Sequence, residues 1–196
     1  MELRLALETD AEEILGIYGP YVLNTAITFE TEVPSPEVFR GRVRGIIPDY
    51  PYLVCLESGK IIGYGYAHRH MERAAYQWNA ELSIYIDGSR LRQGVGKALH
   101  LALVDILRLQ NVRNIYGGVA LPNANSQGIL ESMGFRRVGV YHSTGYKRGA
   151  WRDVAWYEKA IGEYSADPAP FIPLKEIDSR AIREVLKRHS ELLPPG

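Results

Sequence analysis

Residues 81–97 read ELSIYIDGSRLRQGVGK. The first half alternates polar and apolar side chains, as a half-buried strand does, and the second half places Gly94 and Gly96 directly before a run with helical periodicity. Glycines at such a junction let the backbone approach a bulky anion, and the free amides of a first helical turn favour negative charge. Three neighbours add positive charge: Arg90, Arg92 and Lys97. The segment predicts a strand–loop–helix unit that binds a diphosphate.

Two better-known phosphate-binding patterns are excluded by the same residues. The chain contains no GxxxxGK[ST] sequence, so it has no Walker P-loop. The dinucleotide fingerprint lacks its third glycine, because Ala98 and Leu99 follow Gly96. A GxG pair alone also occurs in tight turns that feed helices, so the assignment depends on the rest of the chain.

Hydrophobic periodicity on both sides of this unit predicts a mixed α/β (α+β) domain. Strands are expected at 2–6, 27–30, 51–57, 61–69, 76–87, 115–120, 136–146 and 151–159. Helices are expected around Ile14–Tyr18 and at 36–47, 94–110, 123–134 and 179–192. The helix at 94–110 has the clearest pattern, with apolar residues recurring along one face.

The composition changes beyond about residue 160. Residues 166–170 read ADPAP, typical of a linker, and Asp178 is placed to cap a last helix. The apolar face of that helix is expected to dock on the main domain or on a second subunit: Ile182, Val185, Leu186 and Leu192. We therefore divide the chain into a domain at 1–160 and a helical extension at 161–196.

The composition restricts the possible partners. The 196 residues contain 23 Lys and Arg against 23 Asp and Glu, so no excess charge indicates a nucleic acid or a membrane surface. No segment approaches the ~20 apolar residues that span a bilayer, and the N-terminus lacks a signal-peptide core. A cytoplasmic protein is expected.

The candidate metal ligands are sparse. The single cysteine, Cys55, lies in the apolar run 52–56, which predicts a buried thiol and excludes an intramolecular disulfide. His68 and His70, two residues apart on an expected strand, share a face, but no further His or Cys cluster accompanies them. We predict no metal site.

Several ordered motifs resemble the GNAT superfamily, and within it the phosphinothricin acetyltransferases. They are the 81–97 unit, PNANS at 122–126, MGF at 133–135, TAITFE at 25–30, YQWNAE at 76–81, GYKRGAW at 145–151 and Asp153. The resemblance covers about residues 2–160. It implies a mostly antiparallel twisted sheet flanked by helices, acetyl-CoA as cosubstrate, a small amine as acceptor and a homodimer.

The resemblance also implies which residues hold acetyl-CoA. The backbone of Ile84, Tyr85 and Ile86 would line the acetyl and pantetheine arm, because a strand splayed from its neighbour leaves polar groups free. The diphosphate is expected at Arg92, Gln93, Gly94, Val95, Gly96 and Lys97. From the following helix the expected contacts are Asn123, Ser126 and Ser132. Asn123 is equally suited to cap that helix.

Glu81 is the candidate general base. Acetyl transfer needs an uncharged amine, so a group must accept the ammonium proton. On a regular strand Glu81 shares a face with Ser83 and Tyr85, and a carboxylate among apolar neighbours gains basicity. Many GNAT enzymes place a tyrosine as general acid where this chain has Leu130. That departure leaves the leaving thiolate to solvent or to a hydroxyl such as that of Ser126.

The acceptor site is expected at four positions that match the family: Thr28, Phe29, Arg73 and Tyr76. Arg73 is suited to grip a carboxylate with its planar fork. Lys147, Trp151 and Asp153 are expected to shape the pocket or an interface. Together the matches favour a small amino-acid-like substrate of the phosphinothricin, methionine sulfone or methionine sulfoximine type.

Two alternatives stay open at this stage. One is a GNAT enzyme with another acceptor, such as a polyamine, an aminoglycoside or a protein N-terminus. The other is a non-catalytic acetyl-CoA-binding module, which Leu130 favours and Glu81 opposes.

Overall fold

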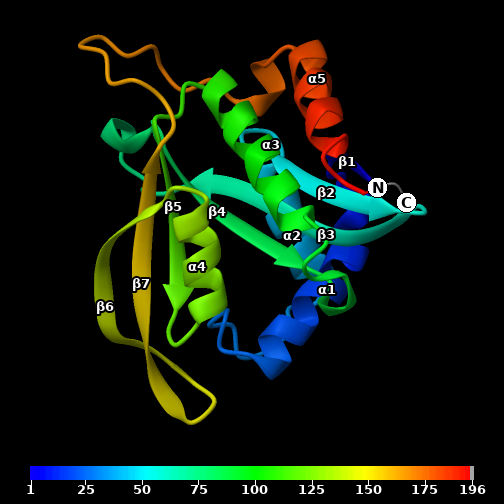
Figure 1. Ribbon diagram of the computed structural model, residues 1–196, viewed down its shortest axis with the longest axis vertical. Coiled ribbons are helices and arrows are strands. Elements are labelled where there is room, and N and C mark those ends of the chain that lie inside the picture. The colour runs from blue at the N-terminus through cyan, green and yellow to red at the C-terminus, as the bar shows by residue number, and fades with distance from the viewer. Residues whose placement is uncertain (195–196) are drawn as a thin grey trace.

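Seven strands form one sheet in the order β1-β2-β3-β4-β5-β7-β6 (Figure 1). The computed structural model describes residues 1–194. The strands are β1 Glu2–Leu5, β2 Tyr52–Glu57, β3 Lys60–Arg69, β4 Asn79–Ile86, β5 Asn114–Ala120, β6 Arg136–Lys147 and β7 Ala150–Ala160. Only β4 and β5 run parallel among the pairs of this sheet. The predicted mixed, mostly antiparallel fold is therefore confirmed.

Five α-helices cover the sheet. They are α1 Ala11–Asn24, α2 Pro36–Ile46, α3 Val95–Leu109, α4 Ala124–Ser132 and α5 Ser179–Ser190. Figure 1 shows α3 and α4 in front of the sheet, while α1 and α2 pack on the other face. Strand β2 shows the effect of two covers: Leu53 and Cys55 join the core under α3, and Val54 joins the core under α1 and α2. A sheet buried on both faces explains the continuous apolar run at 52–56.

The sheet divides between β4 and β5. The two strands pair only over Asn79–Glu81 and Asn114–Tyr116, at the start of each strand. Beyond this point β4 continues against β3 as far as Ile86, and β5 continues against β7 as far as Ala120. The facing edges of 82–86 and 117–120 consequently carry no ladder between them, as the diverging ribbons in Figure 1 show.

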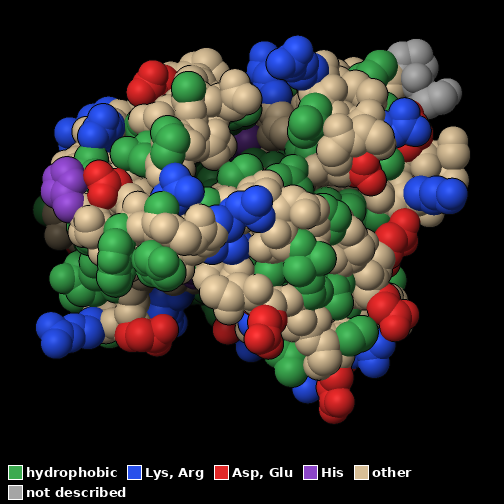
Figure 2. All heavy atoms as spheres, turned by 90° about the horizontal axis from the view of Figure 1, so that it is seen from below, with side chains coloured by type: hydrophobic (Ala, Val, Ile, Leu, Met, Phe, Trp, Pro, Cys, Tyr) green, Lys and Arg blue, Asp and Glu red, His purple; other side chains and the backbone are tan. Residues whose placement is uncertain are grey.

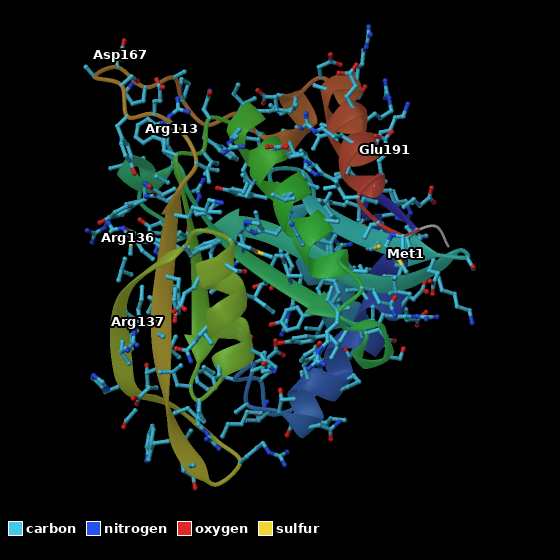
Figure 3. All side chains as sticks on the ribbon, viewed as in Figure 1. Met1, Arg113, Arg136, Arg137, Asp167 and Glu191 are labelled. Carbon is cyan, nitrogen blue, oxygen red and sulfur yellow. The ribbon has the colours of Figure 1, made fainter. Side chains whose placement is uncertain are left out.

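The extension after β7 returns along the sheet and ends beside β1. Its first part is held at Trp78, whose indole N–H donates to the Ala169 carbonyl at 2.8 Å, and at Gln110, whose amide donates to the Ile172 carbonyl at 2.9 Å. Asp167 marks the outer tip of this loop (Figure 3). Helix α5 then packs on α3, capped by Asp178 as predicted.

The structure corrects three expectations about the elements. Residues 27–30 form no strand, because they belong to an irregular connection between α1 and α2. Strand β4 begins at Asn79 rather than at 76, because residues 74–76 form a 3-10 turn. In the extension Leu192, which is expected to be buried, is 58% exposed. Leu193 is buried instead, because α5 ends at Ser190.

No helix within residues 1–194 is both long and apolar enough to cross a bilayer. Within the same range no group of three or more His, Cys, Asp or Glu side chains is arranged to hold a metal ion. Cys55 is buried, and burial raises the pKa of its thiol to about 11.

Candidate active site

The N-terminus of α3 presents free amides at the divergence of β4 and β5. Gly94 is the N-cap with φ of 83°, a left-handed conformation that glycine adopts without strain. A Cβ added at Gly96 would find only Ile86 Cγ1, 4.0 Å away, so the glycine leaves open space above the first turn. Amides of a first turn have no partner within their own helix. This cradle fits a bound diphosphate.

The charged residues of this loop differ in what they can offer. Arg92, with φ of 64°, and Lys97 are exposed, and Gln93 is half-buried beside them. Arg90 instead forms an ion pair with Glu57, with 2.6 Å between Nη2 and Oε2. Arg92 and Lys97 are therefore accessible to an anion, whereas Arg90 is paired with Glu57.

The free edge of β4 supplies the second part of the cofactor side. Ile84 and Ile86 point to the α3 face and Tyr85 to the α1 face, as the alternation of a strand predicts. Unpaired backbone groups on this edge suit the amides of a pantetheine arm. The Ile86 carbonyl already accepts a hydrogen bond of 2.6 Å from the Tyr21 hydroxyl.

Helix α4 borders the opposite edge. Asn123 caps it, since its side-chain oxygen accepts from the Ser126 amide at 3.1 Å. The Ser132 hydroxyl donates to the Ile129 carbonyl at 2.8 Å, and its side chain is exposed. Leu130 points at the sheet, with its methyl groups 3.5 and 3.8 Å from the position of a Cβ on Gly117. Leu130 thus acts as packing and offers no proton.

Glu81 lies at the last paired position before the strands diverge. It stands opposite His68 on β3 and Tyr116 on β5. Its side chain is 23% exposed, and its Oε2 lies 3.4 Å from His70 Nδ1. Because directly opposed antiparallel residues share a face, Glu81 points to the same side as His68, the α1/α2 side.

A cavity of about 200 Å³ opens on that side of the sheet, and His68, the neighbour of Glu81 on β3, is part of its lining. Its lining consists of Tyr18, Glu30, Phe39, Arg42, Ile46, Tyr52, Tyr64, Tyr66 and His68. The rings of Tyr52 and Tyr66 stack at 4.9 Å, and Tyr64 stacks on Tyr85 at 5.3 Å. Burial chiefly, and the nearby Glu81 carboxylate to a smaller degree, raises the pKa of Tyr66. Seen from below, the molecule is hollowed along its middle, between the halves that carry β6–β7 and α1–α2 (Figure 2).

A polar chain ties the connection 25–35 to the cavity wall. The Tyr18 hydroxyl lies 2.7 Å from Thr28 Oγ1 and donates to Glu30 Oε1 at 3.0 Å. Burial chiefly, with Glu30 contributing, raises the pKa of Tyr18 to about 12. Arg42 of α2 pairs with the same Glu30 carboxylate. These contacts fix the loop that carries two predicted acceptor residues.

The hairpin β6–β7 closes the other side of this loop. Lys147 is buried and donates to the Thr28 carbonyl at 2.8 Å. The Phe29 ring lies against Gly145 so closely that a Cβ there would come within 2.6 Å of ring carbons. Thr28 and Phe29 therefore lie between Tyr18 of the cavity lining and the β6–β7 hairpin, and neither is itself a lining residue.

Arg73 and Tyr76 lie on the turn that precedes β4, outside the cavity lining. Arg73 is the N-cap of the 3-10 turn before β4, and both side chains are exposed. Neither lines the cavity. Sequence reasoning also missed Glu30 and Arg42, whose ion pair joins the loop to α2. The two residues are far apart in the sequence, so no local pattern indicates that they pair. The two expected histidines also separate, because only His68 lines the cavity while His70 lies between Tyr116 and Trp156.

Comparison with known proteins agrees with this geometry. The acetyltransferase (GNAT) domain family matches residues 3–156. A phosphinothricin N-acetyltransferase of Streptomyces coelicolor is 33% identical over 165 residues, which cover 82% of this chain and 96% of that protein. An L-methionine sulfoximine/L-methionine sulfone acetyltransferase of Salmonella typhimurium is 26% identical over 170 residues, which cover 86% and 99%.

A solved structure extends the agreement to three dimensions. The crystal structure of a GNAT superfamily phosphinothricin acetyltransferase from Sinorhizobium meliloti, in complex with AcCoA, superposes with a TM-score of 0.81. It is 34% identical, and the match covers 85% of this chain and 92% of that one. The divergent strands, the glycine cradle at α3 and these matches together show that the chain belongs to the GNAT family and is an acetyl-CoA-dependent N-acetyltransferase.

Proposed function

We propose that this N-acetyltransferase acetylates the α-amine of a small amino acid with a polar side chain, of the phosphinothricin, methionine sulfone or methionine sulfoximine type. The observation that carries the proposal is the position of Glu81: it lies where β4 and β5 diverge, on the same face of the sheet as its β3 neighbour His68, which lines the cavity. An amine held at Glu81 lies where β4 and β5 diverge and where the acetyl group is expected. The rest of the acceptor can then bind on the side of the sheet that carries the cavity. The names of the two relatives support this acceptor class.

Glu81 acts as the base in this proposal. Its carboxylate accepts the proton of the acceptor ammonium and so exposes the lone pair that attacks the thioester. Acetyl-CoA, when bound, supplies the acetyl group. Leu130 donates no proton, so the thiolate of coenzyme A takes its proton from solvent or from the Ser126 hydroxyl. A thiol pKa of ~8.5 makes the thiolate a good enough leaving group for this.

Binding of acetyl-CoA is assigned to two surfaces. The exposed backbone of residues 92–97, with Arg92 and Lys97, holds the diphosphate, and the free edge of Ile84–Ile86 orients the pantetheine arm. Asn123 and Ser132 border the arm from α4. A bulky side chain at position 96 would fill the cradle, so Gly96→Val weakens coenzyme A binding measured by calorimetry.

Acceptor binding is assigned to the loop and the cavity. Thr28 and Phe29 form the wall between the cavity and the β6–β7 hairpin. Arg73 and Tyr76, on the turn before β4, supply a guanidinium and a hydroxyl for the acceptor carboxylate.

We further infer a homodimer built on the β6–β7 hairpin. Strand β6 is a long edge strand, and large apolar side chains are exposed on it and on β7: Val138, Tyr141, Tyr146 and Trp151. Hydrophobic side chains gather on this half of the molecule in Figure 2. Residues 1–160 then form the catalytic unit, 161–196 an extension that braces it, and the cytoplasm, which holds acetyl-CoA, is the expected location.

The test is a thiol-release assay combined with titration of acetyl-CoA. The wild-type protein is expected to bind acetyl-CoA and to release thiol with phosphinothricin or methionine sulfone. Glu81→Gln is expected to keep acetyl-CoA binding and to lose turnover by about 100-fold or more. Binding without turnover on any amine would indicate a non-catalytic module, and equal turnover by Glu81→Gln across pH 6–9 would remove Glu81 as the base.

A further inference from the structure

His70 follows directly after β3 and lies against Glu81. Its Nδ1 is 3.4 Å from Glu81 Oε2, and its side chain is only 13% exposed. The ring stacks flat on Tyr116, with 4.1 Å between centroids and 7° between planes. Trp156 of β7 meets it edge-on at 5.6 Å and 66°. Two aromatic neighbours from β5 and β7 therefore fix the imidazole in the plane from which Nδ1 faces the carboxylate.

His70 and His68 have different surroundings. The cavity is lined by His68, which turns its Nδ1 to the Arg69 carbonyl at 2.9 Å. Neither His70 nor Glu81 is among the lining residues, and the carboxylate that His70 contacts is that of Glu81. The titratable groups that face His70 are Glu81 from β4 and Tyr116 from β5, since β7 contributes the neutral Trp156.

We propose that His70 is a positioning residue for Glu81. The Nδ1–H group donates to Glu81 Oε2, which fixes the carboxylate with its other oxygen directed at the acceptor amine. The proposal rests on the proposed role of Glu81, and it adds the residue that holds this base where β4 and β5 diverge.

An isosteric pair of variants isolates the donor. His70→Asn places an amide N–H group where Nδ1 stood, whereas His70→Leu has the same branched shape without a donor. His70→Leu is expected to lower kcat about tenfold or more, with the KM values for acetyl-CoA and acceptor within about twofold of wild type. His70→Asn is expected to regain most of that loss. If both variants lose kcat equally, or if His70→Leu keeps wild-type kcat, the proposal is overturned.

The pH profile gives a readout that a structural role would not move. The acidic limb of the kcat/KM profile is expected to move in His70→Leu and to stay in place in His70→Asn, because only asparagine keeps a donor beside the general base. An unshifted limb in the leucine variant counts against the proposal. His142→Leu is the matched control, because His142 is an exposed histidine that pairs with Asp153 on the β6–β7 hairpin.

Two further measurements separate the possible failures. In a Glu81→Gln background His70→Leu is expected to add no loss, because both changes remove one unit; an additive loss overturns the proposal. Glu81→Gln alone reports whether Glu81 is the base, so failure of the proposed function is seen independently. If thermal unfolding shows that His70→Leu is not folded, His70→Phe takes its place. This variant keeps the stacking on Tyr116 and lacks the donor, so the same changes in kcat and in the pH profile are expected.

Discussion

Gly145 shows how a single residue connects the hairpin with the acceptor loop. Sequence comparison marks it only as part of a motif, while the structure gives the reason: the Phe29 ring occupies the space of its missing Cβ. Gly145→Ala is expected to displace Phe29 and raise the acceptor KM about tenfold. The KM for acetyl-CoA, whose proposed site lies at α3 and the free edge of β4, is expected to stay unchanged. Steady-state kinetics with both substrates varied checks this, and Gly149→Ala, with open space at its Cβ but φ of 75°, controls for backbone strain at the same hairpin.

His100 is the residue whose burial affects acid stability. It is 2% exposed in α3, and burial, with Lys159 nearby, lowers its pKa from 6.5 to about 4. The unfolded chain therefore binds the proton first as pH falls, so the stabilisation present above pH 6.5 is lost between 6.5 and 4. The shift corresponds to about 3 kcal/mol of unfolding free energy. Urea unfolding of wild type and His100→Gln at several pH values checks this, and equal pH slopes in the two would contradict it.

Helix α3 has two roles: its first turn forms the glycine cradle, and its side chains hold α5. Asp105 receives Arg188 Nη2 at 2.7 Å and His189 Nε2 at 2.8 Å from α5. Burial raises the pKa of Asp105, but the hydrogen bonds from His189 and Arg108 outweigh it, and the net pKa is lowered. The contacts of Asp105 with Arg188 and His189 therefore stabilise the fold at pH values above the normal aspartate pKa. This stabilisation is lost as the pH falls through the lowered pKa.

Asp105→Ala is expected to lower the free energy of unfolding by about 2 kcal/mol, because the buried His189 of α5 loses a charged acceptor. Thermal or urea unfolding measures the change. Glu184→Ala on α5 is the control, since its pair with Arg180 is exposed and is expected to contribute within about 0.5 kcal/mol. A loss from Glu184→Ala equal to that from Asp105→Ala would contradict the assignment.

The elements also show how far sequence reasoning reaches. Helix α3 and the hairpin β2–β3 were predictable because their apolar periodicity and turn residues are local. Periodicity predicts a strand around Thr28, whereas the structure has an irregular connection, because Phe29 contacts Gly145 of the hairpin, 116 residues later in the chain. The pairing of His70 with Glu81 depends on the register of β3 against β4, which periodicity does not determine. The glycine cradle was predictable because its chemistry lies within six consecutive residues.

At the scale of the whole molecule, the exposed edge of β6 predicts association. A long edge strand with exposed aromatic side chains is a surface that natural proteins rarely leave uncovered. Sedimentation of the wild type is expected to give a dimer. Trp151→Lys, which places a charge on the most exposed of these rings, is expected to shift the equilibrium towards monomer. A wild-type monomer at micromolar concentration would exclude the dimer.

The opposite edge of the sheet is protected by the chain itself. The Leu3 amide, on the outer side of β1, donates to Ser190 Oγ at 2.8 Å, and Figure 3 shows Met1 and Glu191 on the same side of the molecule. A ribosome makes β1 before α5. At about 5–20 residues per second, roughly 10–40 s separate the two. During that interval the nascent chain carries an open β1 edge that α5 later covers, so mispairing of β1 is to be expected during synthesis rather than in the folded enzyme.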